Sequence, residues 1–350
     1  MKKLVEISAP DFDLATTLDS GQVFHWQKMG DGFVGTIGDL PVYVERRGEI
    51  LRAKVASASR RYLGNNAQDA QATIKHYFAL DHPLAEICAS FPDDPMMNAA
   101  RTFCRGLRII RQPKWECLAT FICSSMKQVA HIRQISRGLR ERFGKPCNID
   151  SPNYGFGRPF LRRGRRSYRG SGALAAVANN STVYTFPPAQ RLAESSESEL
   201  RKCALGYRAK NLRATAQLVR SGRCNLEAWS ALPDAELREH LCAFPGVGAK
   251  IANCVMLFAY ERLRAFPIDV WIERVLRERY FPREKKITAQ RLREFSEMYF
   301  GEHGGYAQQY LFHHARVTMR KSGVSRDSST PLRSARNDKR KGARRRKAQI

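Results

Sequence analysis

The chain has 350 residues, of which 43% are hydrophobic, and a formal net charge of +27 from 60 Lys and Arg against 33 Asp and Glu. These numbers indicate a globular protein of two or more domains with a sizeable core. The sequence contains neither a run of about eighteen apolar residues nor an N-terminal signal core, so we expect an intracellular protein without membrane contact.

The first part of the chain is predicted to form a small antiparallel β domain, over residues 1–83. Alternating stretches at 32–38, 40–48 and 49–55 are separated by Gly-Asp and Arg-Gly turns, which is typical of short strands joined by hairpins.

From residue 84 the pattern becomes helical, and we expect a helical domain over 84–320. Residues 117–144 indicate a helix pair or one interrupted helix, and further apolar faces recur at three- and four-residue spacing in 199–222, 234–244, 248–260, 269–281 and 305–321. The predicted fold class is therefore α+β, with the small β domain first and the helical domain second.

Two basic segments stand apart from this pattern. An arginine-rich insertion at about 155–180 contains six Arg and no acid between 157 and 172, and the tail 321–350 has a net charge of about +9. We expect the tail to be disordered and both segments to act as sequence-independent anchors, because about +12 remains on the folded part and nucleic acid is the leading candidate for a polyanionic partner.

The nine cysteines show no regular spacing, and each lies in an apolar or helical context, so we expect reduced thiols and no disulfides. His313 and His314 are adjacent and point different ways on a helix, without a Cys or carboxylate at ligand spacing. We expect no metal and no cofactor.

The stretch "AFPGVGAKIANC" at 243–254 joins two predicted helices through a tight turn. Gly246 and Gly248 fit a chain reversal that approaches a ligand closely, and the free N–H groups of such a hairpin bind anions. Ile251 stands where a dinucleotide fingerprint needs a small residue, and Ala249 separates Gly248 from Lys250, unlike a P-loop. A DNA phosphate is the natural anion for a basic protein.

Lys250 follows this turn and shares a helix face with Cys254. It fits a plain phosphate contact, or a nucleophilic amine that needs a partner, because only about one lysine in 2,500 is neutral at pH 7. Asp269 in "PIDV" could supply that partner, or it could serve only as a helix N-cap.

These residues carry a resemblance to a known family. "FPGVGAK" at 244–250 with "PIDV" at 267–270 resembles the helix-hairpin-helix base-excision DNA glycosylases. "LDSGQVFHW" at 18–26, "ECLATFICSS" at 116–125, "LGYRAK" at 205–210 and "GYAQQYLF" at 305–312 resemble the 8-oxoguanine DNA glycosylase/AP lyase family in particular. The resemblance covers about residues 10–320, without the arginine-rich insertion.

The resemblance implies an enzyme that flips an oxidised guanine out of double-stranded DNA. Lys250 would attack C1′ and form a Schiff base that permits strand cleavage, assisted by Asp269. Gly21 would accept a hydrogen bond from N7–H, Cys254 and Phe312 would sandwich the base, with Phe258 at the pocket wall, and Gln308 would contact its Watson–Crick edge. By spacing alone, Cys254 and Phe312 fit a packed core as well as a pocket.

The resemblance also implies a DNA-contacting set. The hairpin would hold the DNA backbone, and Tyr207 and Arg208 would fill the gap in the duplex. Met126, His131 and Trp271 stand where better-studied animal members carry other residues that contact the opposite strand or a phosphate, so discrimination for cytosine opposite the lesion is not implied. The full set comprises Pro245, Gly246, Val247, Gly248, Tyr207, Arg208, Met126, His131 and Trp271.

Two alternatives remain at this point. An oxidised-pyrimidine glycosylase/lyase also has a lysine after the hairpin, but its iron-sulfur cysteines follow the catalytic helices, and here none follows Cys254. A non-catalytic hairpin protein that only holds phosphates is the other. We expect a monomer, associated with the nucleoid in a bacterium or located in the nucleus of a eukaryote.

Overall fold

The computed structural model describes residues 4–55, 67–125, 127–150, 180–284 and 286–321. Among these residues no helix is long and apolar enough to span a membrane. The predicted insertion lies almost entirely, and the predicted tail beyond Lys321 entirely, outside the described residues.

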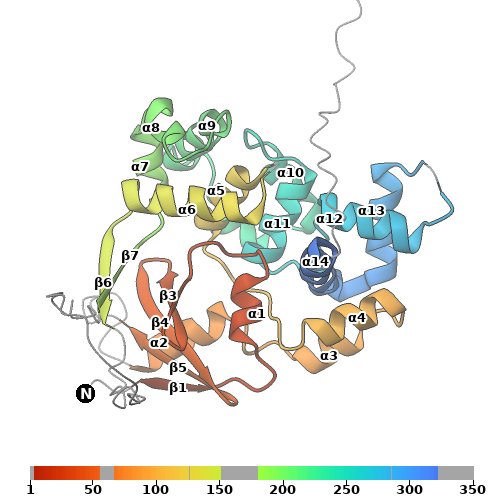
Figure 1. Ribbon diagram of the computed structural model, residues 1–350. Coiled ribbons are helices and arrows are strands. Elements are labelled where there is room, and N and C mark those ends of the chain that lie inside the picture. The colour runs from red at the N-terminus through yellow and green to blue at the C-terminus, as the bar shows by residue number, and fades with distance from the viewer. Residues whose placement is uncertain (1–3, 56–66, 126, 151–179, 285, 322–350) are drawn as a thin grey trace, which may run out of the picture.

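The N-terminal part is a five-stranded antiparallel sheet in the order β1-β5-β4-β3-β2 (Figure 1). Its strands are β1 (Val5–Ser8), β2 (Gln27–Met29), β3 (Gly32–Ile37), β4 (Leu40–Arg47) and β5 (Ile50–Val55). The helices α1 (Leu14–Asp19) and α2 (Ala67–Tyr77) belong to the same part. The predicted strand stretches are confirmed as β3, β4 and β5, and one face of the sheet packs into a core with Phe12, Ile74 and Phe78.

The rest of the described chain is helical apart from one hairpin. Its first helices are α3 (Leu84–Ala89), α4 (Pro95–Phe103), α5 (Lys114–Ser124), α6 (Val129–Phe143), α7 (Ala189–Glu194), α8 (Glu197–Arg201) and α9 (Arg208–Arg220). They are followed by α10 (Asp234–Cys242), α11 (Ala249–Tyr260), α12 (Val270–Val275) with a π turn (Leu276–Tyr280), α13 (Ala289–Phe300) and α14 (Gly304–Lys321). The interrupted pattern at 117–144 is confirmed as a helix pair, and that at 199–222 also divides, into α8 and α9.

A second sheet was not predicted. β6 (Pro146–Asp150) pairs antiparallel with β7 (Asn180–Tyr184), and this hairpin packs against β3 and β4 through Val34, Tyr43, Ile149 and Val183. A segment that follows α6 in sequence therefore belongs in space to the N-terminal sheet. The alternation in these strands is only five residues long, which gives a weak signal.

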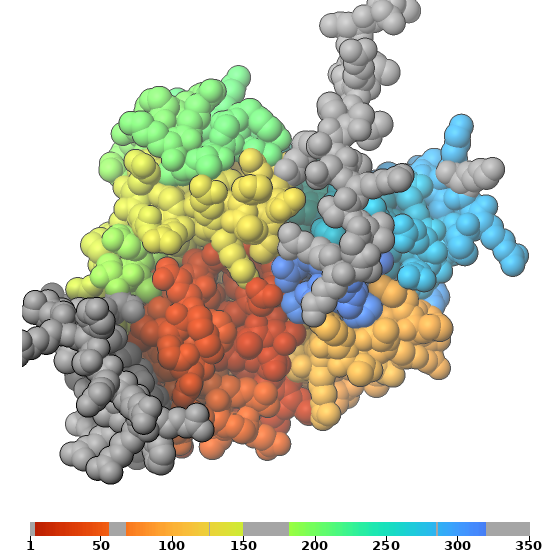
Figure 2. Space-filling model, in the orientation of Figure 1, coloured from red at the N-terminus to blue at the C-terminus, as the bar shows by residue number. Residues whose placement is uncertain are grey.

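The two cores meet near the predicted boundary. The large helical core begins at Leu84, and the sheet core ends at Phe78 and Leu80 except for Ile110. Figure 2 shows the N-terminal residues in red at the centre of one face, adjoined by α6 above and α14 beside them. The site described below lies where these parts come together.

Candidate active site

The hairpin between α10 and α11 has the tight turn that its glycines predicted. Gly246 adopts φ +80°, and a Cβ there would lie 2.4 Å from the Asn211 side-chain nitrogen, so only glycine fits without strain. Gly248 is the N-cap of α11, and nothing lies within 4 Å of the position where its Cβ would be. Val247 points into the core, and its N–H donates to the Phe244 carbonyl (3.1 Å). The open N-terminus of α11 can therefore receive an anion.

Lys250 is the second residue of α11 and is half-buried. Its Nζ lies 5.5 Å from the centre of the Phe121 ring, which stacks on Phe258 at 5.5 Å between ring centres. Burial raises the pKa of the adjacent Cys254 thiol, while a hydrogen bond with Lys250 and its positive charge lower it. The lysine side chain therefore lies over the Phe121 ring and next to the neutral thiol of Cys254.

Asp269 is the helix N-cap that the sequence allowed, and its carboxyl interacts electrostatically with Lys250. It is the N-cap of α12, and its Oδ1 accepts from the N–H groups of Trp271 (3.1 Å) and Ile272 (2.9 Å). Burial raises the pKa of this carboxyl above its ordinary value, although the two N–H groups and the charge of Lys250 act in the opposite direction. The cap therefore fixes a carboxylate beside the lysine, and its basicity is increased by burial.

The loop after α1 is held in one conformation around Gly21. Gly21 adopts φ +88°, and a Cβ there would lie 3.0 Å from a ring carbon of Phe312. The next residue, Gln22, is fully buried; its side chain donates to the Arg108 carbonyl (2.8 Å) and accepts from the N–H of Ile110 (2.7 Å). The backbone of this loop is thereby positioned facing α14.

α14 brings two more predicted residues to the same place. Gln309 donates to the Ser20 carbonyl (2.9 Å), which ties the helix to the Gly21 loop. Gln308 is buried, and its Oε1 has no hydrogen-bond partner in the part of the chain that the structure describes. A buried amide oxygen without a donor is costly, so this atom is suited to a ligand N–H. Phe312, one turn further, is half-buried against Gly21.

The predicted DNA-contacting residues differ in how exposed they are. Tyr207 is 59% exposed and His131 is exposed on α6, so both are accessible. Trp271 is half-buried, and Met126 lies outside the described residues.

Arg208 does not lie where we expected it. Its guanidinium is buried, and it donates to the carbonyls of Ser125 and Leu205. In this conformation it holds the end of α5 and does not face a duplex. Tyr207, which stacks on this guanidinium at 4.4 Å, is the exposed member of the pair.

Some features of the site could not be found from the sequence. Phe121 is hidden in the apolar run of α5, and only the fold shows that it lies under Lys250. A cavity of about 290 Å³ lies elsewhere, among Trp115, Glu116 and Phe186, and none of the predicted site residues lines it. Within the described ranges no group of His, Cys, Asp or Glu is arranged to hold a metal ion.

Comparison with known proteins agrees with this geometry. The model of the HhH-GPD superfamily of base excision DNA repair proteins matches residues 120–299, which is more than half of the chain. The chain belongs to the HhH-GPD superfamily. Residues 4–118 match the N-terminal domain of 8-oxoguanine DNA glycosylase, which includes the Gly21 loop and the sheet.

Individual relatives of this superfamily member span most of its length. It is 26% identical over 319 residues to the N-glycosylase/DNA lyase OGG1 of Arabidopsis thaliana, covering 88% of this chain and 78% of the relative. It superposes with a TM-score of 0.75 and 30% identity on MBOgg1 in complex with a low affinity DNA ligand, over 91% of this chain and 97% of that one.

A bacterial structure is similar to the same extent. The Clostridium acetobutylicum 8-oxoguanine glycosylase/lyase, in complex with double-stranded DNA containing cytosine opposite 8-oxoG, gives a TM-score of 0.73 at 27% identity, over 91% of this chain and 97% of that one. The likeness to these two structures thus extends through both domains.

Proposed function

We propose that this protein is a bifunctional DNA glycosylase and AP lyase that removes 8-oxoguanine from duplex DNA. The observation that carries the proposal is the placement of Lys250 beside the capping carboxylate of Asp269, at the open end of a hairpin in an HhH-GPD chain. The N-terminal 8-oxoguanine glycosylase domain and relatives named N-glycosylase/DNA lyase support the same activity.

The chemistry follows from the positions of these two side chains. Asp269 accepts a proton from the ammonium of Lys250, and the neutral amine attacks C1′ of the flipped nucleotide. The glycosidic C–N bond breaks, the base leaves with the bonding electrons and takes up a proton, and the amine-bound sugar opens to a Schiff base. Loss of the 2′ proton and of the 3′ phosphate then cleaves the strand. The carboxylate also stabilises the positive charge that develops on the sugar.

The base is recognised by groups from three elements in this proposal. The Gly21 carbonyl accepts from the N7–H that only the oxidised guanine has, and Cys254 and Phe312 cover its two faces. The buried Oε1 of Gln308 accepts from an N–H on the Watson–Crick edge, which supplies its missing partner. Because Phe312 rests on Gly21 without DNA, the ring must move aside when the base enters.

A single-turnover experiment tests the proposal. Four duplexes are used, each with one 8-oxoguanine opposite a different normal base. A parallel reaction with each duplex is trapped with borohydride. We expect strand cleavage and a covalent adduct for the wild type, and neither for Lys250→Gln. Lys202→Gln, which changes an exposed lysine, is the matched control and should react normally.

The partner dependence adds information about the opposite strand. Cleavage opposite cytosine alone would mean that other residues replace the family's usual contacts at Met126 and His131. Cleavage opposite all four bases would mean that selectivity for the opposite base is relaxed, and it would attribute this to Met126 and His131. If no partner gives an adduct, the chain is a DNA-binding protein without this chemistry.

A further inference from the structure

The end of α11 opposite Lys250 is built in an unusual way. The helix ends at Glu261, which has a left-handed backbone conformation (φ 55°, ψ 31°), a position where glycine is preferred and any other residue is strained. The contacts of the Glu261 side chain compensate for this backbone conformation. His82 and Arg111 bind its carboxylate and lower the pKa of Glu261 to about 2.

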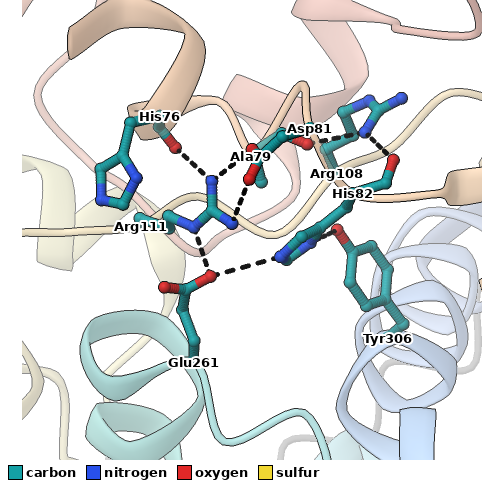
Figure 3. A network of polar contacts seen from close by, with 8 residues as sticks. All are labelled: His76, Ala79, Asp81, His82, Arg108, Arg111, Glu261 and Tyr306. Carbon is teal, nitrogen blue, oxygen red and sulfur yellow. Dashed lines mark hydrogen bonds and ion pairs between the residues drawn. The ribbon is translucent and has the colours of Figure 1, made fainter. Parts of the chain in front are cut away.

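Glu261 connects the end of α11 to two stretches, residues 78–83 before α3 and residues 104–113 before α5, which together we call the linking segment (Figure 3). Its Oε1 accepts from Nε of Arg111 and lies 3.3 Å from Nε2 of His82. Arg111 also holds both carboxylate oxygens of Asp81 (2.5 and 2.9 Å) and the carbonyl of His76 (3.0 Å). The linking segment is therefore rigidly attached to the end of α11.

His82 extends this contact to α14. Its Nδ1 lies 2.8 Å from the hydroxyl of Tyr306, which is fully buried. Its Nε2 faces the Glu261 carboxylate, and because a carboxylate oxygen can only accept, the ring donates there. We call Tyr306, His82 and Glu261 the corner relay.

The relay lies next to a close contact between the two helices. The N–H of Gly305, the residue before Tyr306, donates to the Leu263 carbonyl (2.7 Å), and a Cβ on Gly305 would lie 2.3 Å from the Leu257 side chain. No side chain fits at this contact, which brings the start of α14 against the end of α11. We call this contact between the end of α11 and the start of α14 the corner.

The residues proposed to cover the base lie at equal distances from this corner. Cys254 is six residues before the end of α11 at Tyr260, and Phe312 is six residues after Tyr306 on α14. Both separations correspond to about 9 Å along a helix. A rotation of one helix by about 5° at the corner would change the gap between Cys254 and Phe312 by about 0.8 Å, which is enough to disturb a ring sandwich.

We propose that the corner relay is a positioning device that sets the gap between Cys254 and Phe312, and that it therefore controls base excision more than cleavage at an abasic site. This inference rests on the proposed function. Excision requires the base to be held between α11 and α14. Cleavage at an abasic site requires only that Lys250 and Asp269 reach the sugar.

The test replaces Tyr306 by Phe, which removes one hydroxyl from the relay. Tyr310→Phe is the matched control, because Tyr310 is equally buried on the same helix and its hydroxyl donates to the Leu107 carbonyl (3.0 Å), not to the relay. Single-turnover excision of 8-oxoguanine and cleavage of a preformed abasic site are measured side by side, together with thermal unfolding.

We expect Tyr306→Phe to slow excision about fivefold and to leave abasic-site cleavage within about twofold of wild type. Tyr310→Phe should change neither rate by more than about twofold, even if it lowers the melting temperature equally. A parallel fall of both rates in Tyr306→Phe, or unchanged excision, would overturn the inference.

A second variant keeps the test valid if Tyr306→Phe folds poorly. His82→Gln removes the middle of the relay at a partly exposed position, and it should show the same selective loss of excision. In the double variant the two effects should not add, because both act through one chain of hydrogen bonds. Failure of the proposed function is distinguishable, because the wild type would then give no trapped adduct with either substrate.

Discussion

The two ends of α11 are built in opposite ways. At its N-terminus the cap is Gly248, without a side-chain hydrogen bond and with open space around it, and Lys250 is half-buried. At its C-terminus Glu261 is bonded to two side chains of the linking segment. At the end that would meet DNA, the polar groups of α11 are therefore free to bind a ligand. At the other end, they are bonded within the protein.

The middle of α11 is packed on nearly all sides. Apart from Ala259, every residue from Ile251 to Tyr260 is buried. A helix packed on all sides moves as one piece, because protein interiors are as dense as organic crystals. What fixes the C-terminal end therefore also sets the angle between α11 and α14, and with it the position of Cys254.

The largest expected effect comes from removing the base at the open end. Asp269→Asn should slow both excision and abasic-site cleavage by about 10²- to 10³-fold, because the amide can still cap α12 but cannot take a proton from Lys250. Single-turnover kinetics measure this loss. Activity within tenfold of wild type would contradict the role of Asp269.

The same variant has a stability signature with a defined sign. Burial raises the folded-state pKa of Asp269 above its ordinary 3.8, so ionisation of this group opposes folding. Relative to Asp269→Asn, the wild type should lose stability as the pH rises from below 3.8 through the raised pKa, and the difference should stay constant above it. Chemical unfolding of both proteins across this range measures the trend.

The hairpin glycines offer a comparison of intermediate size. Gly246→Ala should lower the free energy of unfolding by about 1–2 kcal/mol, because it forces a left-handed alanine against Asn211. Gly248→Ala has an allowed φ of −109° and open space, so its stability should change by about 0.5 kcal/mol at most.

Affinity for DNA, unlike stability, should change in Gly248→Ala. The new methyl group of Gly248→Ala would project into the space that the DNA backbone is expected to enter, so affinity for a duplex should fall without a loss of stability. Fluorescence anisotropy at one fixed salt concentration measures this. Unchanged affinity in Gly248→Ala would show that the duplex does not approach this turn.

The last comparison concerns the fixed end of α11. Glu261→Gln should lower the free energy of unfolding by about 1 kcal/mol near neutral pH, a modest value because the carboxylate is 38% exposed. The folded-state pKa of about 2 lies below the ordinary 4.5, so the wild-type advantage should be complete above 4.5 and should disappear as the pH falls towards 2. A constant difference across this range would mean that the charge of Glu261 contributes nothing.

The sequence was a good guide wherever the pattern is local. The α+β class and the order of its two parts are confirmed, because short alternation in β3 to β5 and helical spacing in α11 and α14 are properties of neighbouring residues. The family motifs also predict Lys250 and Asp269 as a pair, and the turn and the cap that carry them are encoded within a few residues.

Contacts between distant segments could not be predicted in this way. Arg208 was expected at the DNA, but its position depends on a carbonyl 83 residues away in sequence, at Ser125. The partners of Glu261 lie 150 and 179 residues away, and nothing in the local pattern of α11 indicates them. A charged side chain in a sequence motif does not say which surface it will face.

The β6/β7 hairpin has a consequence for engineering. Its register pairs Asp150 with Asn180, so the two chain ends from which residues 151–179 depart are held next to each other by a ladder that packs on the main sheet. A four-residue turn in place of residues 151–179 would therefore join two strand ends that already face each other. The hairpin tip is therefore a natural position for a peptide tag or an inserted reporter domain.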